Sequence, residues 1–265
     1  TESTVRRTPP FLGIEFPARC KMTTKIPKRI IQTGNSVDLP LLAQAGVTNI
    51  RLLNPDFEYV YFDDTARWAF VATHFPQYVD IVHSFEHPAQ RYDFFRYLAI
   101  YQLGGFYFDL DIFLVQNLSP LLGDGCVFPF ERLTWSDYLR EKFNMDWEIG
   151  NYAFGASAGH PFIKACIDNC IRAKNDPGWA AIPILSLPKS LRNDLTVIYS
   201  TGPGLVSRTL AEYDNAVYPV EVLFPEDVSD KKNCWNLFGK FGVHLALGTW
   251  RNRRNPFARR LLQFV

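Results

Sequence analysis

The sequence predicts an α/β fold with a mostly parallel central sheet flanked by helices. Short apolar segments typical of buried strands alternate with segments whose apolar residues recur at helical spacing. In residues 91–115 a helical pattern runs into two glycines and then into an apolar segment, which is the order of a helix followed by a buried strand. The 265 residues contain no internal repeat and no low-complexity linker, so one domain is the simplest interpretation.

The composition is that of an ordinary globular protein, with 47% hydrophobic and 21% charged residues. The 28 Lys and Arg nearly balance the 27 Asp and Glu, so we expect no nucleic-acid partner that depends on non-specific attraction to phosphates. The sequence has no run of about 18 apolar residues and no signal-peptide pattern at its start. We therefore expect no membrane-spanning segment within it.

The elements before residue 63 are predicted from short patterns. Residues 1–25 are rich in Thr, Pro and Arg without periodicity, which indicates a tail or stem. Residues 28–34 read as a buried strand that ends at a glycine turn, and residues 39–45 have a helical pattern. We expect a second strand at Ile50–Leu53 and, after an Asn-Pro-Asp turn, a third at Phe57–Phe62.

A helix is predicted to begin near Arg91 and to end at Gly104 and Gly105. Its apolar residues have the i, i+3, i+4, i+7 spacing of one helix face: Phe94, Tyr97, Leu98 and Tyr101. Asp93 and Arg96 lie three residues apart on another face, where their side chains can pair.

The cysteines predict no metal site, because they show neither Cys-x-x-Cys spacing nor a histidine at ligand spacing. Cys166 and Cys170 fall instead in the apolar stripe of a helix predicted over residues 161–174. We interpret both as small core residues.

Phe106–Phe108 is predicted to be a buried strand, and Asp109 and Asp111 follow it before the apolar residues Ile112–Val115. Residues two apart on a strand point to the same side, with Cα atoms roughly 7 Å apart, so these carboxylates would repel one another. A divalent cation such as Mg²⁺ or Mn²⁺ would relieve the repulsion and hold a diphosphate at the carboxyl end of the strand. The alternative is a solvated turn, which the apolar flanks disfavour.

Three kinds of enzyme could use such a pair of carboxylates. A glycosidase needs them on opposite sides of a sugar, about 5 to 9 Å apart, and two acids on one face of a strand hardly meet that orientation. A haloacid-dehalogenase-like phosphohydrolase has a strand ending in Asp-x-Asp, here Asp109 and Asp111, but its pattern continues with Thr or Val where this chain has Phe113. A metal-dependent nucleotide-sugar transferase needs only one ion between carboxylate and diphosphate.

A longer set of residues narrows the choice: Asp93, Arg96, Tyr97, Gly104, Gly105, Tyr107, Asp109 and Asp111. In this combination the segment closely resembles the sugar-binding region of glycosyltransferase family 32. That family includes α-1,6-mannosyltransferases, inositol-phosphoceramide mannosyltransferases, and α-1,4-galactosyl- and N-acetylglucosaminyltransferases, and glucosylating bacterial toxins share its signature. The resemblance covers roughly residues 26–251, with further matching blocks at residues 26–33, 54–59, 151, 159–162, 201–204 and 244–250.

The resemblance implies a GT-A nucleotide-binding fold, a divalent ion (Mn²⁺ or Mg²⁺) and transfer with retention at the anomeric carbon. By position, Asp93 and Arg96 are candidate catalytic residues that would hold hydroxyls of the donor sugar. Tyr107 would lie near the base or ribose, Asp109 would contact ribose and metal, and Asp111 would be the main metal ligand. The alternative for Asp93 and Arg96 is a surface helix pair worth about 0.3 to 0.5 kcal/mol.

Residues outside this segment complete the predicted site. Asn151 is a further candidate catalytic residue, with an ordinary helix boundary as its alternative. His244 and Thr249 are candidate metal ligands, although a lone histidine in an apolar strand is more often a core residue. The predicted nucleotide-sugar-binding set comprises Gln32, Thr33, Asp93, Arg96, Tyr107, Asp109 and Trp250.

We therefore predict a single domain over residues 26–254 that acts as a metal-dependent retaining glycosyltransferase. It would move a hexose from GDP-mannose or a UDP-hexose to a hydroxyl of a glycan or glycolipid. The alternative to an enzyme is a non-catalytic module that binds a nucleotide sugar or a carbohydrate.

Residues 255–265 form a basic tail with interleaved apolar residues, which predicts peripheral contact with an anionic bilayer. The alternative is a solvated end that packs on its own domain. The stem-like N-terminus favours the Golgi lumen, membrane-associated through a trimmed type II precursor. The alternative location is the bacterial cytoplasm, peripheral to the inner membrane.

Overall fold

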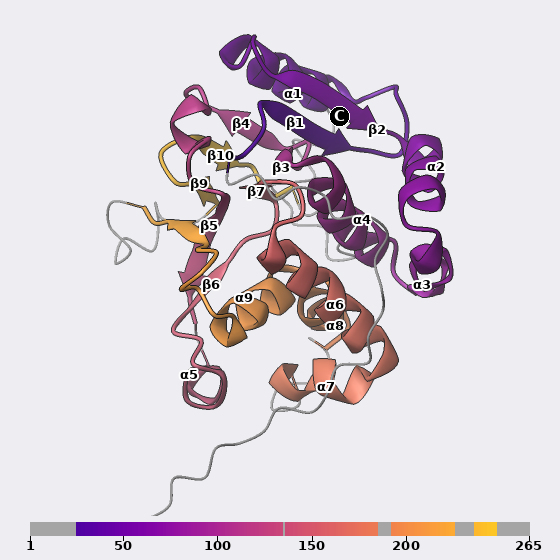
Figure 1. The fold of residues 1–265 in the computed structure, drawn as a ribbon, viewed down its shortest axis with the longest axis vertical. Helices are drawn as coiled ribbons and strands as arrows, with labels where there is room; N and C mark the ends of the chain where they lie inside the picture. Colours follow the sequence, from indigo (N-terminus) through magenta and orange to yellow (C-terminus); the bar gives the residue numbers. More distant parts are fainter. Residues whose placement is uncertain (1–24, 135, 185–191, 226–235, 248–265) are drawn as a thin grey trace, which may run out of the picture.

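A central sheet lies between helices in the computed structural model, which describes residues 25–134, 136–184, 192–225 and 236–247 (Figure 1). The strands are β1 (Arg29–Thr33), β2 (Glu58–Phe62), β3 (Gly105–Phe108), β4 (Ile112–Leu114), β5 (Cys126–Leu133), β6 (Trp147–Ile149), β7 (Ala153–Ala156), β8 (Glu221–Leu223), β9 (Leu237–Phe238) and β10 (Gly242–His244). The helices are α1 (Leu41–Leu53), α2 (Asp64–His74), α3 (Val79–Ser84), α4 (Pro88–Leu103), α5 (Asp137–Phe143), α6 (Pro161–Asn175), α7 (Pro177–Ala181), α8 (Arg192–Ser200) and α9 (Pro203–Glu212).

The described strands form a seven-stranded sheet in the order β2-β1-β3-β7-β5-β6, in which β8 also pairs with β5. β1 is parallel to β2 and β3, and β8 is parallel to β5. β7 is antiparallel to both β3 and β5, and β6 is antiparallel to β5. Hence β1, β2, β3, β5 and β8 run in one direction, and the predicted fold with a mostly parallel sheet is confirmed.

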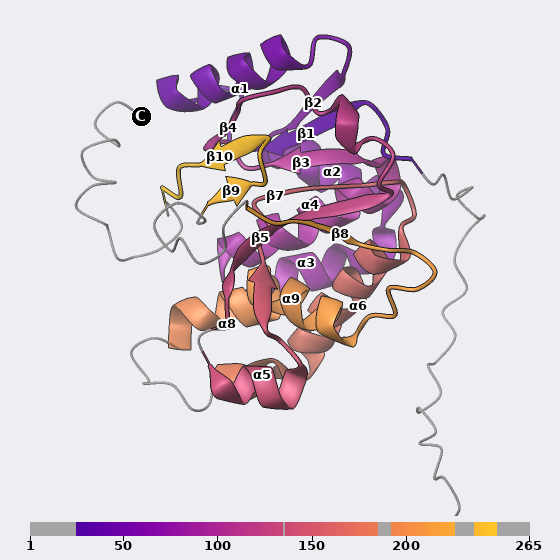
Figure 2. The same ribbon diagram turned by 90° about the vertical axis from the view of Figure 1, so that its left-hand side faces the viewer.

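The central strand β3 is buried on both faces. Tyr107 joins the core formed with α4 and α6, whereas Phe106 and Phe108 join the core formed with α1 and β4. Figure 2 shows the second sheet, β4-β10-β9, on the same side as α1, with α4, α6 and α9 on the other side. Burial on both faces explains why Phe106–Phe108 lacks the polar alternation of a half-exposed strand.

The predicted strand at Ile50–Leu53 is wrong, because these residues form the end of α1. The buried residues of α1 are Ala43, Gly46 and Ile50, which have the i, i+3, i+7 spacing of a helix face. A four-residue apolar segment does not by itself distinguish a strand from the last turn of a helix. The helix predicted over residues 161–174 is α6, and its Cys166 and Cys170 are fully buried, so their interpretation as core residues is confirmed.

Gly104 and Gly105 let α4 end and β3 begin in consecutive residues. Their φ angles are +63° and +112°, which residues with a Cβ rarely adopt. A Cβ on Gly105 would lie 2.6 Å from the carbonyl oxygen of Arg29 in β1. The absence of a side chain therefore allows β3 to pair closely with β1, which places the ends of these two strands side by side.

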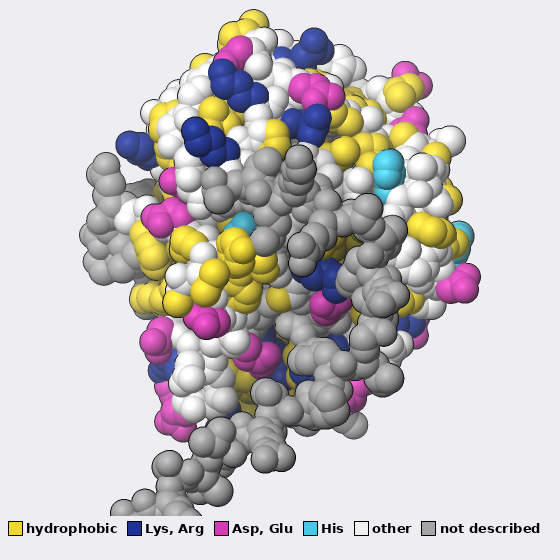
Figure 3. Space-filling view, viewed as in Figure 1, with side chains coloured by type: hydrophobic (Ala, Val, Ile, Leu, Met, Phe, Trp, Pro, Cys, Tyr) yellow, Lys and Arg dark blue, Asp and Glu magenta, His cyan; other side chains and the backbone are white. Residues whose placement is uncertain are grey.

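The surface seen in Figure 3 carries basic and acidic side chains intermingled over its described part. This distribution agrees with the formal net charge of +1. Within the part of the chain that the structure describes, no helix is long and apolar enough to cross a bilayer.

We expect Gly105→Ala to lower the free energy of unfolding by about 2 to 4 kcal/mol, because it adds backbone strain and a clash with β1. Gly123→Ala is the matched control, since a Cβ there meets nothing within 4 Å. It should change the stability by less than about 0.5 kcal/mol. Urea unfolding of the two variants measures both values, and equal stability would contradict this account of the α4–β3 junction.

Candidate functional site

Asp109 and Asp111 follow the carboxyl end of β3, where the backbone holds the first of them firmly. The Asp109 amide donates to the carbonyl oxygen of Tyr152 at 2.8 Å, and its carbonyl accepts from Ile112 at 3.2 Å. Gln32 at the end of β1 donates a further bond to that carbonyl at 3.2 Å. The pairing of β1 with β3 thus fixes where the aspartates emerge from the sheet.

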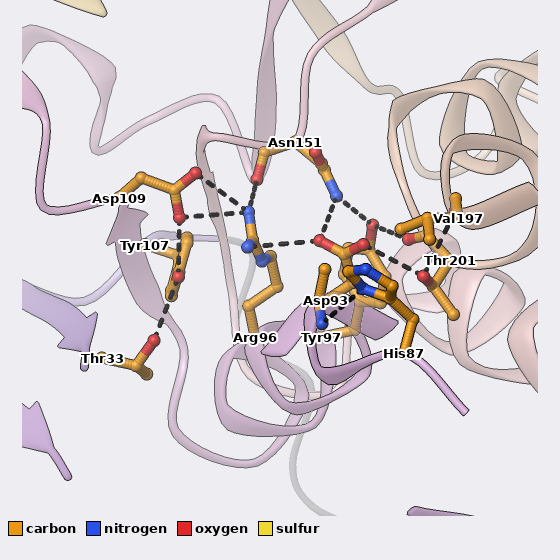
Figure 4. A network of polar contacts seen from close by, with 11 residues as sticks. Thr33, His87, Asp93, Arg96, Tyr97, Tyr107, Asp109, Asn151, Val197 and Thr201 are labelled. Atoms are coloured by element: carbon orange, nitrogen blue, oxygen red, sulfur yellow. Dashed lines mark hydrogen bonds and ion pairs between the residues drawn. The ribbon is translucent and has the colours of Figure 1, made fainter. Parts of the chain in front are cut away.

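Arg96 on α4 is the centre of a buried polar network (Figure 4). Its guanidinium lies 3.2 Å from a carboxylate oxygen of Asp93 and 3.2 Å from one of Asp109. It also donates to the carbonyl oxygen of Asn151 at 2.6 Å, and its Cζ stacks 4.6 Å from the centre of the Tyr107 ring. Because Asp93 and Arg96 are each only 7% exposed, the alternative of a surface helix pair is wrong.

Further hydroxyl and amide groups hold the two carboxylates that flank Arg96. Tyr107 donates to Asp109 at 2.9 Å, and its hydroxyl also lies 3.2 Å from that of Thr33. The side-chain amide of Asn151 donates to Asp93 at 3.0 Å, and the hydroxyl of Thr201 donates to the other oxygen of Asp93 at 3.0 Å. Both carboxylates are therefore held in one orientation by donors from several elements.

The second aspartate of the pair faces a histidine. Nε2 of His244 lies 3.2 Å from Oδ1 of Asp111, and the His244 ring stacks on Tyr152 with 4.2 Å between ring centres. The antiparallel pairing of β10 with β4 creates this contact, because it places His244 opposite Ile112. The amide of Leu247 donates to Oδ2 of Asp111 at 3.0 Å.

These residues form a donor set that fits a divalent cation. Ligand atoms of Asp109, Asp111 and His244 all lie within 4.8 Å of one another. Two carboxylate oxygens and one imidazole nitrogen suit Mn²⁺, and the carboxylates also suit Mg²⁺. With the carboxylates of Asp93, Asp109 and Asp111 ionised, Arg96 charged and His244 neutral, the site has a net charge of −2, which a divalent cation would balance.

Burial and neighbouring charges shift the pKa values of these groups. Burial raises the pKa of Asp93 and that of Asp109, and in both cases the Arg96 charge opposes the shift. Burial also acts to raise the pKa of Asp111, but the hydrogen bond and charge of His244 outweigh it, so this pKa is lowered. For His244, the bond and charge of Asp111 outweigh burial and raise the pKa.

The structure brings together nine of the predicted site residues: Gln32, Thr33, Asp93, Arg96, Tyr107, Asp109, Asp111, Asn151 and His244. The other two, Thr249 and Trp250, lie outside the described residues. No role in the site was predicted for Tyr97, Tyr152 or Thr201, which contact the network directly, although Tyr97 belongs to the set of residues that carries the family resemblance. The sequence offered one signal for Thr201, its place at the start of a Thr-Gly-Pro-Gly block.

Residues 42–128 match a family model described as "Glycosyltransferase sugar-binding region containing DXD motif". The chain is 30% identical over 186 residues to inositol phosphoceramide mannosyltransferase 3 of Schizosaccharomyces pombe, covering 69% of this chain and 44% of the relative. It is 27% identical over 188 residues to mannosyl phosphorylinositol ceramide synthase SUR1 of Saccharomyces cerevisiae, covering 71% of this chain and 42% of the relative. The chain thus spans less than half the length of these two relatives.

Among solved structures, the UDP-bound glycosyltransferase domain of the YGT toxin superposes with a TM-score of 0.51 and 8% sequence identity. The match covers 76% of this chain and 80% of that one. Its ligand-free form has the same TM-score with 10% identity. At this identity the likeness concerns the fold alone, and it confirms the predicted GT-A architecture.

The Asp111–His244 pair predicts a pH-dependent contribution to stability in metal-free buffer. The raised pKa of His244 stabilises the fold below the ordinary histidine value of 6.5, and this contribution is lost as the pH rises through the folded value. The lowered pKa of Asp111 stabilises the fold above the ordinary value of 3.8 and is lost as the pH falls through the folded value. The free energy of unfolding of the wild type should therefore exceed that of His244→Gln by the largest margin, about 1 to 3 kcal/mol, between about pH 4 and 6.5.

Urea unfolding from pH 4 to 9 with EDTA present measures this difference. His83→Gln is the control, since His83 is exposed and lies outside the network. A difference between wild type and His244→Gln that is the same at pH 5 and pH 9 would rule out the ion pair.

Proposed function

This chain belongs to the glycosyltransferases whose sugar-binding region contains a DXD motif, and we propose that it transfers a hexose from a nucleotide sugar to a hydroxyl of a glycan or glycolipid. The observation that carries this proposal is the position of Arg96. It lies between Asp93, at the side of the predicted donor sugar, and Asp109, at the side of the predicted cation and diphosphate. Arg96 would thus lie between the hexose and the diphosphate of the donor, at the bond that the reaction breaks.

We propose that Asp109, Asp111 and His244 hold Mn²⁺ or Mg²⁺, with Thr249 as a further ligand outside the described residues. The short distances within this donor set and the net charge of −2 support the assignment. When bound, the ion would neutralise negative charge on the departing nucleoside diphosphate.

The chain's own groups then bind and orient the donor. Asp93 and Arg96 would receive hydroxyls of the hexose, and Asp109 would contact the ribose. Tyr107 would lie near the base or ribose, held by Thr33. Asn151 contacts both Asp93 and Arg96, so it would keep their relative positions during the reaction. Gln32 supports Asp109 from β1, and the proposed role of Trp250 is to cover the donor.

We propose that transfer retains the anomeric configuration. The bond between the anomeric carbon and the phosphate oxygen breaks, and the acceptor oxygen forms its bond to that carbon from the same face. The acceptor proton would pass to the departing phosphate oxygen, so that the donor itself serves as the base. Arg96 would stabilise the negative charge that develops on the leaving group.

The donor and acceptor are proposed from the relatives. One of the relatives is named an inositol phosphoceramide mannosyltransferase and the other a mannosyl phosphorylinositol ceramide synthase, so GDP-mannose is the first donor to test and a glycolipid the first acceptor. UDP-hexoses remain the alternative donors. We also propose residues 26–254 as a single domain, located in the Golgi lumen and associated with the membrane.

A screen of GDP-mannose, UDP-galactose, UDP-glucose and UDP-N-acetylglucosamine with Mn²⁺ tests the activity. The wild type should hydrolyse or transfer from one of them, and EDTA should abolish the reaction. Asp111→Asn should reduce the rate at least about 100-fold, because it removes a charged ligand of the predicted ion. Asp168→Asn is the matched control on α6, where Asp168 pairs with Lys164 on the surface.

Proton NMR of the product reports whether the anomeric configuration is retained. Binding of a nucleotide sugar without turnover would favour the non-catalytic module. An unchanged rate in Asp111→Asn would reject the metal site, and inversion would reject the retaining mechanism.

The membrane prediction concerns residues 255–265, which lie outside the described residues. In a flotation assay with liposomes that contain anionic lipid, the full chain should float with the vesicles at low salt. Deletion of residues 255–265 should reduce the floated fraction several-fold, and 0.5 M salt should have a similar effect because it screens the basic residues. Equal floated fractions for the full chain and for the chain without residues 255–265 would contradict this proposal.

A further inference from the structure

The connection from the end of α8 to α9, residues 200–202, packs on the face of α4 that carries Asp93. Three residues of α4 at i, i+3, i+7 spacing contact it: Gln90, Asp93 and Tyr97. Gln90 donates to the hydroxyl of Ser200 at 2.8 Å, and Tyr97 donates to the carbonyl oxygen of Thr201 at 2.7 Å. Between these bonds, the hydroxyl of Thr201 donates to Oδ2 of Asp93 at 3.0 Å. A segment 108 residues away in the chain thus orients Asp93.

The local sequence fixes Thr201 within this turn. The amides of Thr201 and Gly202 both donate to the carbonyl oxygen of Val197, at 3.1 and 3.0 Å, and Pro203 begins α9 directly afterwards. A Cβ on Gly202 would lie 3.0 Å from Cα of Ile198, so glycine allows the turn to close against α8. Thr201 is fully buried, and its hydroxyl lies 3.0 Å from Oδ2 of Asp93 and 3.4 Å from the carbonyl oxygen of Val197, so the shorter contact favours Asp93 as the acceptor.

Asn151 closes these contacts into a ring of four residues (Figure 4). Its side-chain amide donates to the Tyr97 hydroxyl at 2.8 Å and to Oδ1 of Asp93 at 3.0 Å. Since Arg96 also contacts Oδ1, at 3.2 Å, that oxygen already has two partners. Oδ2 accepts from the Thr201 hydroxyl, and a carboxylate oxygen accepts two hydrogen bonds, so Oδ2 can receive a second donor. The Thr201 hydroxyl thus occupies one of the two acceptor positions of Oδ2.

We infer that Thr201 is a positioning residue that determines how Asp93 receives a hydroxyl of the donor hexose. This inference rests on the proposed function, because it takes the hexose side of the site to be Asp93. In the same assignment the diphosphate would lie on the other side of Arg96, toward Asp109 and Asp111. Loss of the Thr201 hydroxyl therefore weakens recognition of the hexose and leaves recognition of the nucleoside diphosphate intact.

The test compares Thr201→Val, which removes the hydroxyl at nearly constant volume, with Thr201→Ser, which keeps it. The probes are GDP-mannose, UDP-galactose, UDP-glucose and UDP-N-acetylglucosamine with Mn²⁺, each beside its own nucleoside diphosphate, in isothermal titration calorimetry. For the nucleotide sugar that the wild type binds, Thr201→Val should raise Kd by about 10- to 100-fold, the usual effect of removing a hydrogen bond to a charged group. Its Kd for the diphosphate should change less than about 3-fold, and Thr201→Ser should behave like the wild type.

Ser200→Ala is the matched control, because it removes a hydrogen bond from the same turn to α4 without touching Asp93. It should leave both Kd values unchanged. Three results would overturn the inference: equal losses for nucleotide sugar and diphosphate in Thr201→Val, equal losses in Thr201→Val and Ser200→Ala, or no loss in either. A wild type that binds none of the four nucleotide sugars would instead contradict the proposed function.

If Thr201→Val fails to fold, Tyr97→Phe takes its place. This variant removes the bond to the Thr201 carbonyl and the acceptor for Asn151 while keeping the ring in the core. Tyr97→Phe should weaken binding of the nucleotide sugar and leave binding of the diphosphate unchanged. Thr201→Ser should have the same Kd values as the wild type. Any other combination in these two variants rejects the positioning role.

Discussion

The site depends on one buried guanidinium that two carboxylates share. Arg96 lies 3.2 Å from Asp93 and 3.2 Å from Asp109, and it is 7% exposed. Removing three charges from water costs several kcal/mol per ion, and mutual attraction offsets this only where further hydrogen bonds complete the network. The carbonyl of Asn151 and the hydroxyls of Tyr107 and Thr201 supply those bonds. The network therefore requires α4, β1, β3 and the α8–α9 turn to be in place together.

The other half of the site has a different electrostatic balance. Without an ion, Asp111 faces His244, whose raised pKa favours the proton that neutralises this carboxylate. A metal ligand must be deprotonated, so an ion that binds here competes with that proton. Asp109 differs in the direction of its shift, because burial raises its pKa while the charge of Arg96, which persists throughout the accessible pH range, opposes that shift. An ion at this site therefore competes with protons at Asp109 as well as at the Asp111–His244 pair.

The sequence predicted the local part of this arrangement well. The helical spacing before Gly104 and the apolar strand after it place Asp93, Arg96, Tyr107 and Asp109 correctly, because each depends on neighbours within a few residues. Ile50 was misassigned because a short apolar segment fits a strand and a helix end equally well. The contacts of Thr201 with α4 depend on how distant helices pack, and no pattern around Thr201 reports which face of α4 it meets.

This division between local and distant contacts has a consequence for how such a site changes. Asp109 and Asp111 both follow the carboxyl end of β3, so one short motif contains both of them. The partners that orient Asp93 come from the turn between β6 and β7 and from the turn between α8 and α9, 58 residues away for Asn151 and 108 for Thr201. Substitutions there can change the direction in which Asp93 accepts a hydrogen bond while Arg96 keeps its contact with Asp109. On the proposed function, the hexose preference can therefore vary independently of the motif.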